Sequence, residues 1–328
     1  MKLGTLNLTN NLILAPMLQV STGPFRRFCR KFGEIGLVSV PMLYTKRIEK
    51  NPKTVLSDLH KIEDEKPISI QLIGSEINAL KCSIEFLESY KFDVLDLNAG
   101  CPSKRAIKAQ EGGYLLKDLV RLKNLINTAL KYSSRPVSLK IRIGYNNLND
   151  LDKLLNVINN SGIEFMTVHG RTVKDRYSDA TLNLNAIKKI KSLSKIPVVG
   201  NGSIFNPQNA KDFLELTNVD ALMIGRGSLG NPNIFNQIDQ YLKEGTLTIT
   251  ENNINNMITK IRLYERCVNE YLENNFEISY SHEKYKFVEL KRNLIWLSKN
   301  IHDSTDFRIK ISKTRTLEEL ESILDYLN

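Results

Sequence analysis

The chain has 328 residues, of which 41% are hydrophobic and 25% are charged, a composition typical of globular proteins rather than of disordered or fibrous ones. No run of about 18 apolar residues occurs and the first ten residues lack the apolar core of a secretory signal, so we expect neither a membrane span nor export. The formal net charge is +10, and residues 1–250 carry the excess, with 34 basic and 23 acidic side chains. Such an excess favours a polyanionic partner, although many basic proteins have none.

Cysteine usage predicts a reducing environment. Cys29, Cys82, Cys101 and Cys267 are far apart and form no Cys-x-x-Cys pair, which argues against a disulfide framework and against a zinc site. We therefore expect a cytoplasmic protein without a bound metal. Three of these cysteines, all except Cys101, lie in helix-like segments, where we expect small buried side chains.

Apolar runs of strand length recur along the chain, and they are continuous rather than alternating, as in strands buried on both faces. Pro67, Pro136 and Pro197 each precede one of these runs and end the helix before it. The runs are Leu12–Ala15, Leu37–Val40, Ile68–Leu72, Val94–Leu97, Val137–Ile141, Phe165–Val168, Val198–Val199 and Ala221–Ile224.

Helix-like stretches separate these runs, and residues 77–89, 115–130 and 151–159 have apolar side chains at three- and four-residue spacing. Eight strands alternating with helices within about 235 residues is the count of a TIM (β/α)8 barrel, an α/β fold. A doubly wound dinucleotide fold would carry GxGxxG after the first strand, whereas Pro16 and Met17 follow that strand here.

From about residue 254 onward strand signals disappear, and residues 254–273, 283–299 and 316–327 have helical periodicity. We therefore predict a barrel domain at residues 1–245, followed by a small all-helical domain at residues 246–328.

The residues after the carboxyl ends of barrel strands meet at one face, where barrel enzymes have their active sites. At six of the eight predicted ends these residues are polar or cationic, which predicts an active site without naming its substrate. The clearest case is Asn98-Ala99-Gly100-Cys101-Pro102. A thiol in a polar turn at the mouth of a strand is placed to act on a ligand rather than to pack.

Two glycine-containing loops follow the last two strands, at Asn201-Gly202-Ser203 and at Gly225-Arg226. Barrels often build a phosphate site there, because glycine lets the backbone approach a phosphate and arginine adds a fork of donors. Tight turns are the alternative for either loop alone. Both loops together favour a phosphate-bearing cofactor or substrate.

Two further strand ends favour ligand contacts. Lys140 interrupts an apolar strand, where a buried ammonium needs an anion; the electron-rich edge of a reduced flavin would suit it, and an ion pair within the barrel is the alternative. His169 is one of four histidines and lies beside Arg171. We interpret His169 as functional, with a satisfied polar residue as the alternative.

The motifs occur in one order between about residues 11 and 236, and this ordered set resembles the tRNA-dihydrouridine synthase family. The residues that carry the resemblance are Ala15-Pro16-Met17, Gln71-Leu72-Ile73-Gly74, Asn98-Ala99-Gly100-Cys101-Pro102, Lys140-Ile141-Arg142, His169-Gly170-Arg171-Thr172, Gly200-Asn201-Gly202 and Gly225-Arg226-Gly227-Ser228-Leu229-Gly230-Asn231-Pro232.

The resemblance implies FMN across the barrel mouth, NADPH (alternatively NADH) as electron donor, and tRNA as partner. We expect a monomer, although the sequence does not indicate the oligomeric state. Hydride would pass from flavin N5 to uracil C6, and Cys101 would protonate C5 as a neutral thiol. The target base must leave its stack to be reached. The implied flavin-binding residues are Pro16, Met17, Gln71, Lys140, His169, Asn201, Gly202, Ser203, Gly225 and Arg226.

For the substrate, the resemblance implies that Asn98 contacts the pyrimidine edge and that Arg171 contacts the substrate. We expect Lys104 and Arg105 to contact RNA phosphates, with solvated surface charge as the alternative. The chain departs from the family pattern at Ser203, where an acid is common, and in its last helices, so the sequence does not indicate which uridine is reduced. Three alternatives stay open: a flavin barrel for a small molecule, an RNA-binding barrel without catalysis, and a phosphosugar barrel without flavin.

Overall fold

The computed structural model describes residues 1–62, 65–246, 254–274, 277–278, 280–299, 301 and 304–325. All eight predicted runs are strands of one parallel sheet with the order β3-β11-β10-β9-β8-β7-β6-β4. The strands are β3 (Leu12–Leu14), β4 (Val38–Ser39), β6 (Ile68–Ile73), β7 (Val94–Ala99), β8 (Val137–Arg142), β9 (Phe165–His169), β10 (Val198–Asn201) and β11 (Ala221–Ile224), and a short β5 (Leu43–Tyr44) pairs with β6.

The sheet closes on itself. Ile13 in β3 forms a parallel bridge to Leu37 beside β4, and the Leu14 N–H donates to the Leu37 carbonyl at 2.9 Å. The predicted TIM barrel is therefore confirmed, with continuous apolar strands because both faces of the sheet are covered.

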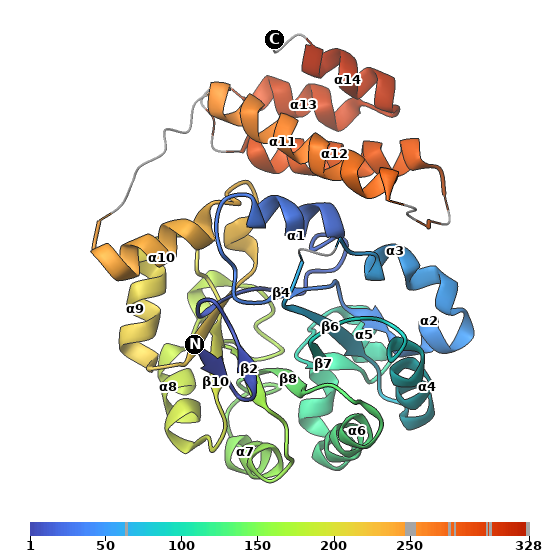
Figure 1. The fold of residues 1–328 in the computed structure, drawn as a ribbon. Helices are drawn as coiled ribbons and strands as arrows, with labels where there is room; N and C mark the ends of the chain where they lie inside the picture. The colour runs from blue at the N-terminus through green and yellow to red at the C-terminus, as the bar shows by residue number, and fades with distance from the viewer. Residues whose placement is uncertain are drawn as a thin grey trace.

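Helices surround the barrel (Figure 1). They are α1 (Gly23–Arg30), α2 (Thr45–Lys50), α3 (Leu56–Leu59), α4 (Ile77–Leu87), α5 (Lys104–Lys108), α6 (Leu119–Tyr132), α7 (Leu151–Asn159), α8 (Leu184–Leu193), α9 (Pro207–Thr217) and α10 (Ile234–Glu244), with the 3-10 turns η1 (Pro52–Val55), η2 (Gly112–Lys117), η3 (Asp179–Thr181) and η4 (Arg226–Ser228).

One helix boundary differs from the prediction. The stretch 115–130 is divided between η2 and α6, because the Asp118 side chain accepts the Arg121 N–H at 3.0 Å and begins a new helix there.

A short antiparallel hairpin of β1 (Lys2–Leu3) and β2 (Leu6–Asn7) precedes the barrel and was not predicted. Leu3 of the hairpin packs in one cluster with Val94 and Phe165, the first residues of β7 and β9. The hairpin therefore covers the amino end of the barrel, in front of the strands in Figure 1. The carboxyl ends of the strands are left for a site.

Four helices follow the barrel, α11 (Ile254–Glu273), α12 (His282–Leu297), α13 (Thr305–Lys313) and α14 (Leu317–Asp325). They form a layer beside the barrel, against α1 (Figure 1). The three predicted C-terminal helices correspond to α11, α12 and α14, whereas α13 was not predicted. The predicted boundary at 245/246 follows Gly245, the residue that caps the end of α10. Residues 247–253 lie outside the described part, and the division into two domains stays a prediction.

The contact between barrel and helices is partly polar. The buried Glu289 carboxylate on α12 accepts hydrogen bonds from Thr22, before α1, at 3.0 Å and from Tyr264 on α11. Phe25 on α1 meets the Trp296 ring edge-on at 6.2 Å between centroids. This packing fixes the C-terminal helices on one side of the barrel.

Two of the three helical cysteines agree with the prediction. Cys29 and Cys267 are buried, and burial raises the pKa of both thiols. The prediction was wrong for Cys82, which is exposed on the outer side of α4.

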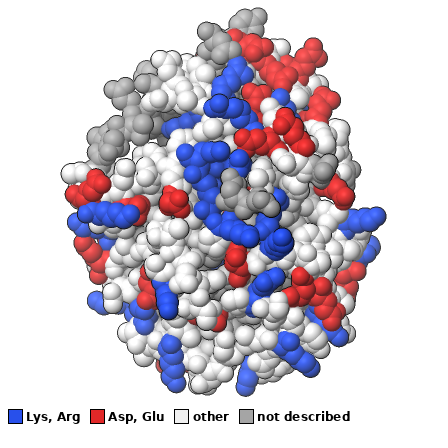
Figure 2. Space-filling model, viewed as in Figure 1, with Lys and Arg blue, Asp and Glu red and all other residues white. Residues whose placement is uncertain are grey.

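None of the described helices has the length and apolar character needed to cross a membrane. Lys and Arg side chains gather on the face in Figure 2 where the barrel meets the C-terminal helices, whereas Asp and Glu gather over those helices. The basic and acidic side chains on this face are thus partly separated, which the counts along the sequence do not show.

Candidate active site

A cavity of about 400 Å³ opens at the carboxyl ends of the barrel strands, within the size range of small-molecule sites. Most of the predicted site residues line it, although they come from seven separate strand ends. Those residues are Pro16, Met17, Gln71, Asn98, Cys101, Lys140, His169, Asn201, Gly202, Ser203, Gly225 and Arg226.

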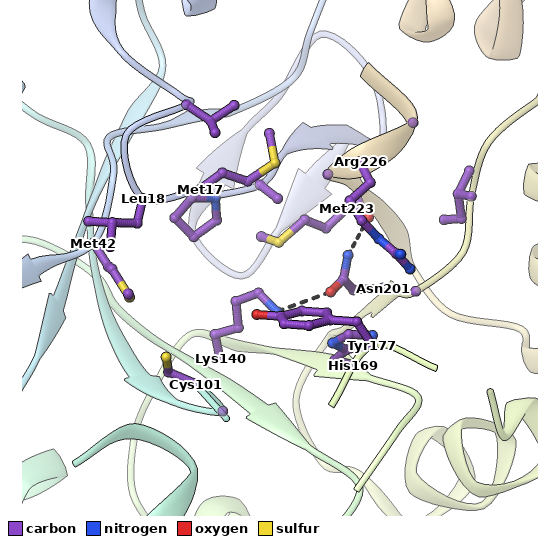
Figure 3. A pocket seen from close by; sticks show the side chains of 18 of the residues that line it. Met17, Leu18, Met42, Cys101, Lys140, His169, Tyr177, Asn201, Met223 and Arg226 are labelled. Carbon is purple, nitrogen blue, oxygen red and sulfur yellow. Dashed lines mark hydrogen bonds between the residues drawn. The ribbon is translucent and has the colours of Figure 1, made fainter. Parts of the chain in front are cut away.

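The cavity has an apolar and a polar side (Figure 3). Met17, Met42 and Met223 bring thioethers to one side, and Lys140 and His169 bring nitrogen groups to the other. Thioether side chains are polarizable and adapt to flat rings. The arrangement suits a planar ligand that has apolar faces and a polar edge.

Lys140 projects from β8 into the cavity, where its ammonium donates a hydrogen bond to Asn201 Oδ1 at 3.1 Å (Figure 3). Asn201 Nδ2 in turn donates to the Met223 carbonyl at 2.7 Å, which fixes the orientation of the amide. Burial lowers the pKa of Lys140 to about 8, and the Arg142 charge adds to this effect. An ammonium in this setting is stabilised by a bound anion.

The turn that carries Cys101 is held by Asn98. Asn98 Oδ1 accepts the N–H groups of Gly100 and Cys101 at 3.1 and 2.9 Å. The Cys101 side chain is 9% exposed, and its Sγ lies 3.5 Å from the Ser103 hydroxyl. The thiol therefore reaches the cavity from a turn of defined geometry.

A buried polar chain continues behind Asn98. Asn98 Nδ2 donates to Gln71 Oε1 at 2.8 Å, Gln71 Nε2 donates to Asp96 Oδ2 at 2.6 Å, and Ser138 donates to Asp96 Oδ1 at 2.7 Å. The amides of Gln71 and Asn98 are thus engaged within the protein. Sequence reasoning missed Asp96 and Ser138, although a carboxylate inside the apolar run Val94–Leu97 was a signal.

Close backbone packing also holds Cys101. Gly112, at the start of η2, has φ +59°, and a Cβ added there would lie 2.8 Å from the Cys101 Cβ. The Gly113 N–H donates to the Cys101 carbonyl at 3.0 Å. Glycine at position 112 is required both by its backbone conformation and by the contact.

His169 is neutral and has a defined tautomer. Burial and the neighbouring charges of Lys140, Arg142 and Arg171 lower its pKa far below the ordinary value. Arg171 Nη1 lies 3.0 Å from His169 Nε2. Because a guanidinium group only donates, Nε2 must accept, and this assigns the proton to Nδ1.

Arg171 does not line the cavity. Its fully buried guanidinium lies behind the cavity wall, where it contacts His169, the Ser178 carbonyl at 2.5 Å and the Asp179 carboxylate at 3.0 Å. The chain makes a tight turn at Gly170, with the Arg171 N–H donating to the His169 carbonyl at 2.7 Å. This turn directs Arg171 away from the cavity, where a contact with the substrate was predicted.

Lys104 and Arg105 also lie outside the cavity lining. They begin the short helix α5, which directly follows the Cys101 turn. The Arg105 guanidinium lies over the Tyr44 ring at 4.0 Å from its centroid.

Tyr177 is a lining residue that sequence reasoning missed. It comes from the segment between β9 and α8, and its ring lies 5.2 Å from the Arg142 guanidinium and 5.9 Å from that of Arg226.

Among the described residues no group of His, Cys, Asp and Glu has a metal-binding arrangement.

The sequence model of the dihydrouridine synthase (Dus) family matches residues 13–327. The chain belongs to this family. The tRNA-dihydrouridine synthase B of Pseudomonas aeruginosa is 35% identical over 246 residues, which are 74% of this chain and 73% of that protein. A probable tRNA-dihydrouridine synthase of Rickettsia prowazekii is 30% identical over 314 residues, 95% of this chain and 92% of that protein.

Solved structures outside this family share the fold. Histamine dehydrogenase from Rhizobium sp. 4-9 superposes with a TM-score of 0.57 at 13% identity, over 81% of this chain and 50% of that one. Morphinone reductase has a TM-score of 0.51 at 12% identity, over 76% of this chain and 90% of that one. This chain spans about half the length of the dehydrogenase. At such identities the likeness shows the fold alone.

Proposed function

We propose that this dihydrouridine synthase family member reduces uridine to dihydrouridine in tRNA, with FMN bound in the barrel cavity and NADPH as electron donor. NADH is the alternative donor. The observation that carries the proposal is the meeting of the Cys101 thiol, the Lys140 ammonium and both glycine loops in one cavity. Family membership supports the reaction and the tRNA substrate.

The cavity residues fit FMN. The Lys140 ammonium donates to Asn201 and makes no described ion pair, so it is ready for the electron-rich edge of the ring system. Pro16 and Met17 offer an apolar surface to the ring. The neutral His169 has Nδ1–H left to donate, since Nε2 is used by Arg171.

We assign the FMN phosphate to the loops after β10 and β11. Gly202 has φ +133°, a conformation that glycine adopts without strain and that lets the backbone approach an anion. Ser203, Gly225 and Arg226 complete this set, and Arg226 remains 41% exposed. A phosphate bound by these loops would therefore reach the Arg226 guanidinium, which is accessible from the cavity.

FMN, when bound, supplies the hydride for uracil C6. The C5 atom of the uracil then needs a proton, and Cys101 is the general acid that we assign to this step. A positioned acid of this kind contributes about 10²–10⁴-fold to a rate. Asn98 and Gln71 hold the Cys101 turn, because their amides are bonded to each other and to the backbone of the turn.

The tRNA must present an unstacked uridine to the cavity. We assign Lys104 and Arg105 to contacts with the RNA backbone, because α5 follows the Cys101 turn directly. Such contacts hold phosphates without reading sequence. The C-terminal helices are the proposed second RNA contact, and their arrangement would select the uridine.

Nucleoside mass spectrometry of tRNA tests the proposal. The purified protein is loaded with FMN and incubated with NADPH and tRNA that lacks dihydrouridine, and fragment mapping identifies the modified position. We expect dihydrouridine to form only when NADPH is present. A protein that binds FMN and oxidises NADPH but leaves this tRNA unchanged would instead support a reductase of small molecules.

A further inference from the structure

One carboxylate oxygen lies at the centre of the groups behind the phosphate loops. Asp179 Oδ1 accepts hydrogen bonds from Arg171 Nη2 at 3.0 Å, from Ser203 Oγ at 2.8 Å and from Arg226 Nη2 at 2.9 Å. These donors belong to three different strand ends, while Asp179 itself begins η3 between β9 and α8. A single side chain thus links three segments of the barrel mouth.

Arg171 depends on this carboxylate. Its guanidinium is fully buried, and Asp179 is its ion-pair partner within the described part of the chain. The remaining hydrogen-bond partners of Arg171 are uncharged: the His169 ring, the Ser203 hydroxyl and the Ser178 carbonyl. A buried cation without a counter-ion is strongly destabilised.

Asp175 is the other carboxylate near Arg171, but it serves a different group. Its Oδ2 accepts the N–H and the hydroxyl of Thr172 at 3.0 and 2.7 Å. Asp175 therefore adds favourable charge at longer range without a bond to the guanidinium. It does not replace Asp179.

The link extends to both ends of the cavity. Arg171 makes His169 Nε2 an acceptor, so Asp179 fixes the histidine tautomer through Arg171. On the other side Asp179 holds Ser203 and Arg226, two residues that we assign to the phosphate. Hydrogen bonds from Ser203 and Arg226 lower the pKa of Asp179, so its carboxylate stays ionised near neutral pH.

We propose that Asp179 is a positioning residue of the FMN site, whose carboxylate orders Arg171, Ser203 and Arg226 and through them His169 and the phosphate loops. This role rests on the proposed function, because it presumes that FMN occupies the cavity. A competing role makes the opposite prediction. If the carboxylate instead occupied the place of the phosphate, its removal would tighten FMN binding.

A carboxylate at position 203 could replace that of Asp179 as the partner of Arg171. Ser203 Oγ lies 2.6 Å from Arg171 Nη2 and 2.8 Å from Asp179 Oδ1. Ser203 has φ +48°, a left-handed conformation in which aspartate and asparagine are enriched. A carboxylate introduced by Ser203→Asp would therefore reach Arg171 from the other side of the same network.

The test compares Asp179→Asn with the double variant Asp179→Asn/Ser203→Asp. Asp152→Asn, which removes an 80% exposed carboxylate of α7, is the matched control. Apo-protein is titrated into FMN and the quenching of flavin fluorescence gives Kd. The absorption spectrum and the reduction potential of the bound flavin are then recorded, and circular dichroism confirms folding.

We expect Asp179→Asn to weaken FMN binding about tenfold or more, since a close charge partner is lost, and to shift the flavin spectrum and potential. The double variant returns a charge partner to Arg171 and should recover the wild-type spectrum and potential at saturating FMN, while its affinity stays low because the new carboxylate lies beside the phosphate loops. Asp152→Asn should match the wild type. Unchanged or tighter binding by folded Asp179→Asn would overturn the inference, as would a folded double variant that recovers nothing. A wild-type protein that binds no FMN would instead refute the proposed function.

Discussion

The ammonium of Lys140 should make FMN binding depend on pH. Burial lowers its pKa to about 8, whereas an electron-rich ligand edge beside it raises that pKa again. Binding therefore favours the protonated form. The affinity is at its full value below pH 8 and falls as the pH rises through 8 towards the higher pKa of the complex.

The magnitude follows from the charged fraction of the free protein. With a pKa of about 8, about nine-tenths of the Lys140 side chains are charged at pH 7 and about one-tenth at pH 9. FMN should therefore bind about tenfold more weakly at pH 9, a loss of about 1.4 kcal/mol. The phosphate does not interfere, because its second pKa of about 6 lies below this range, and His169 stays neutral throughout.

Quenching of FMN fluorescence by apo-protein at pH 7, 8 and 9, at constant ionic strength, measures this effect. Lys140→Met keeps the length of the side chain and removes the titrating group, so this variant should bind FMN more weakly at pH 7 and show no fall towards pH 9. Equal wild-type affinities at pH 7 and 9 would refute the reasoning. So would the same fall in Lys140→Met.

Two further predictions concern packing. Gly112→Ala and Gly162→Ala both place alanine at positive φ, at +59° and +92°, but only the first brings a Cβ within 2.8 Å of the Cys101 side chain. Gly162→Ala should lose about 1 kcal/mol of unfolding free energy, Gly112→Ala should lose more because of the added contact, and only Gly112→Ala should slow dihydrouridine formation. Glu289→Gln alters the buried carboxylate that joins α1 to α11 and α12 and should lower the unfolding free energy in urea by about 2 kcal/mol. The exposed Glu283→Gln on the same helix should change it by less than about 0.5 kcal/mol. Equal activities of the two glycine variants, or equal stabilities of the two glutamine variants, would contradict these interpretations.

The barrel could be predicted because its signals are local. Each strand is a continuous apolar run, and a proline ends the helix before three of them. The hydrophobic pattern and the helix-ending residues therefore indicate the same boundaries. Helix α13 shows the opposite case. Its apolar residues Phe307, Ile309 and Ile311 alternate as in a strand, yet Ile309 is 44% exposed and Ile311 is buried. Packing against α12 and α14, which the sequence does not record, decides its conformation.

The candidate site divides in the same way. Residues in the last part of a strand, such as Lys140 in β8 and Asn201 in β10, could be placed because parallel strands end at one face. The position of Arg171 could not be predicted, because the tight turn at Gly170 points its side chain behind the cavity wall instead of into the cavity. Asp179 belongs to an irregular segment whose path depends on long-range contacts with Ser203 and Arg226, and no local pattern predicts such contacts.

The central claim is that the Cys101 thiol protonates the uracil that FMN chemistry reduces. The direct measurement is the single-turnover rate at which reduced, FMN-loaded protein converts unmodified tRNA to dihydrouridine. Cys101→Ala is compared with the wild type and with Cys82→Ala, which removes the exposed thiol of α4. We predict that Cys101→Ala keeps its flavin and its tRNA affinity but is about 10²-fold slower or more, while Cys82→Ala matches the wild type. A wild-type rate in flavin-loaded Cys101→Ala would contradict the account.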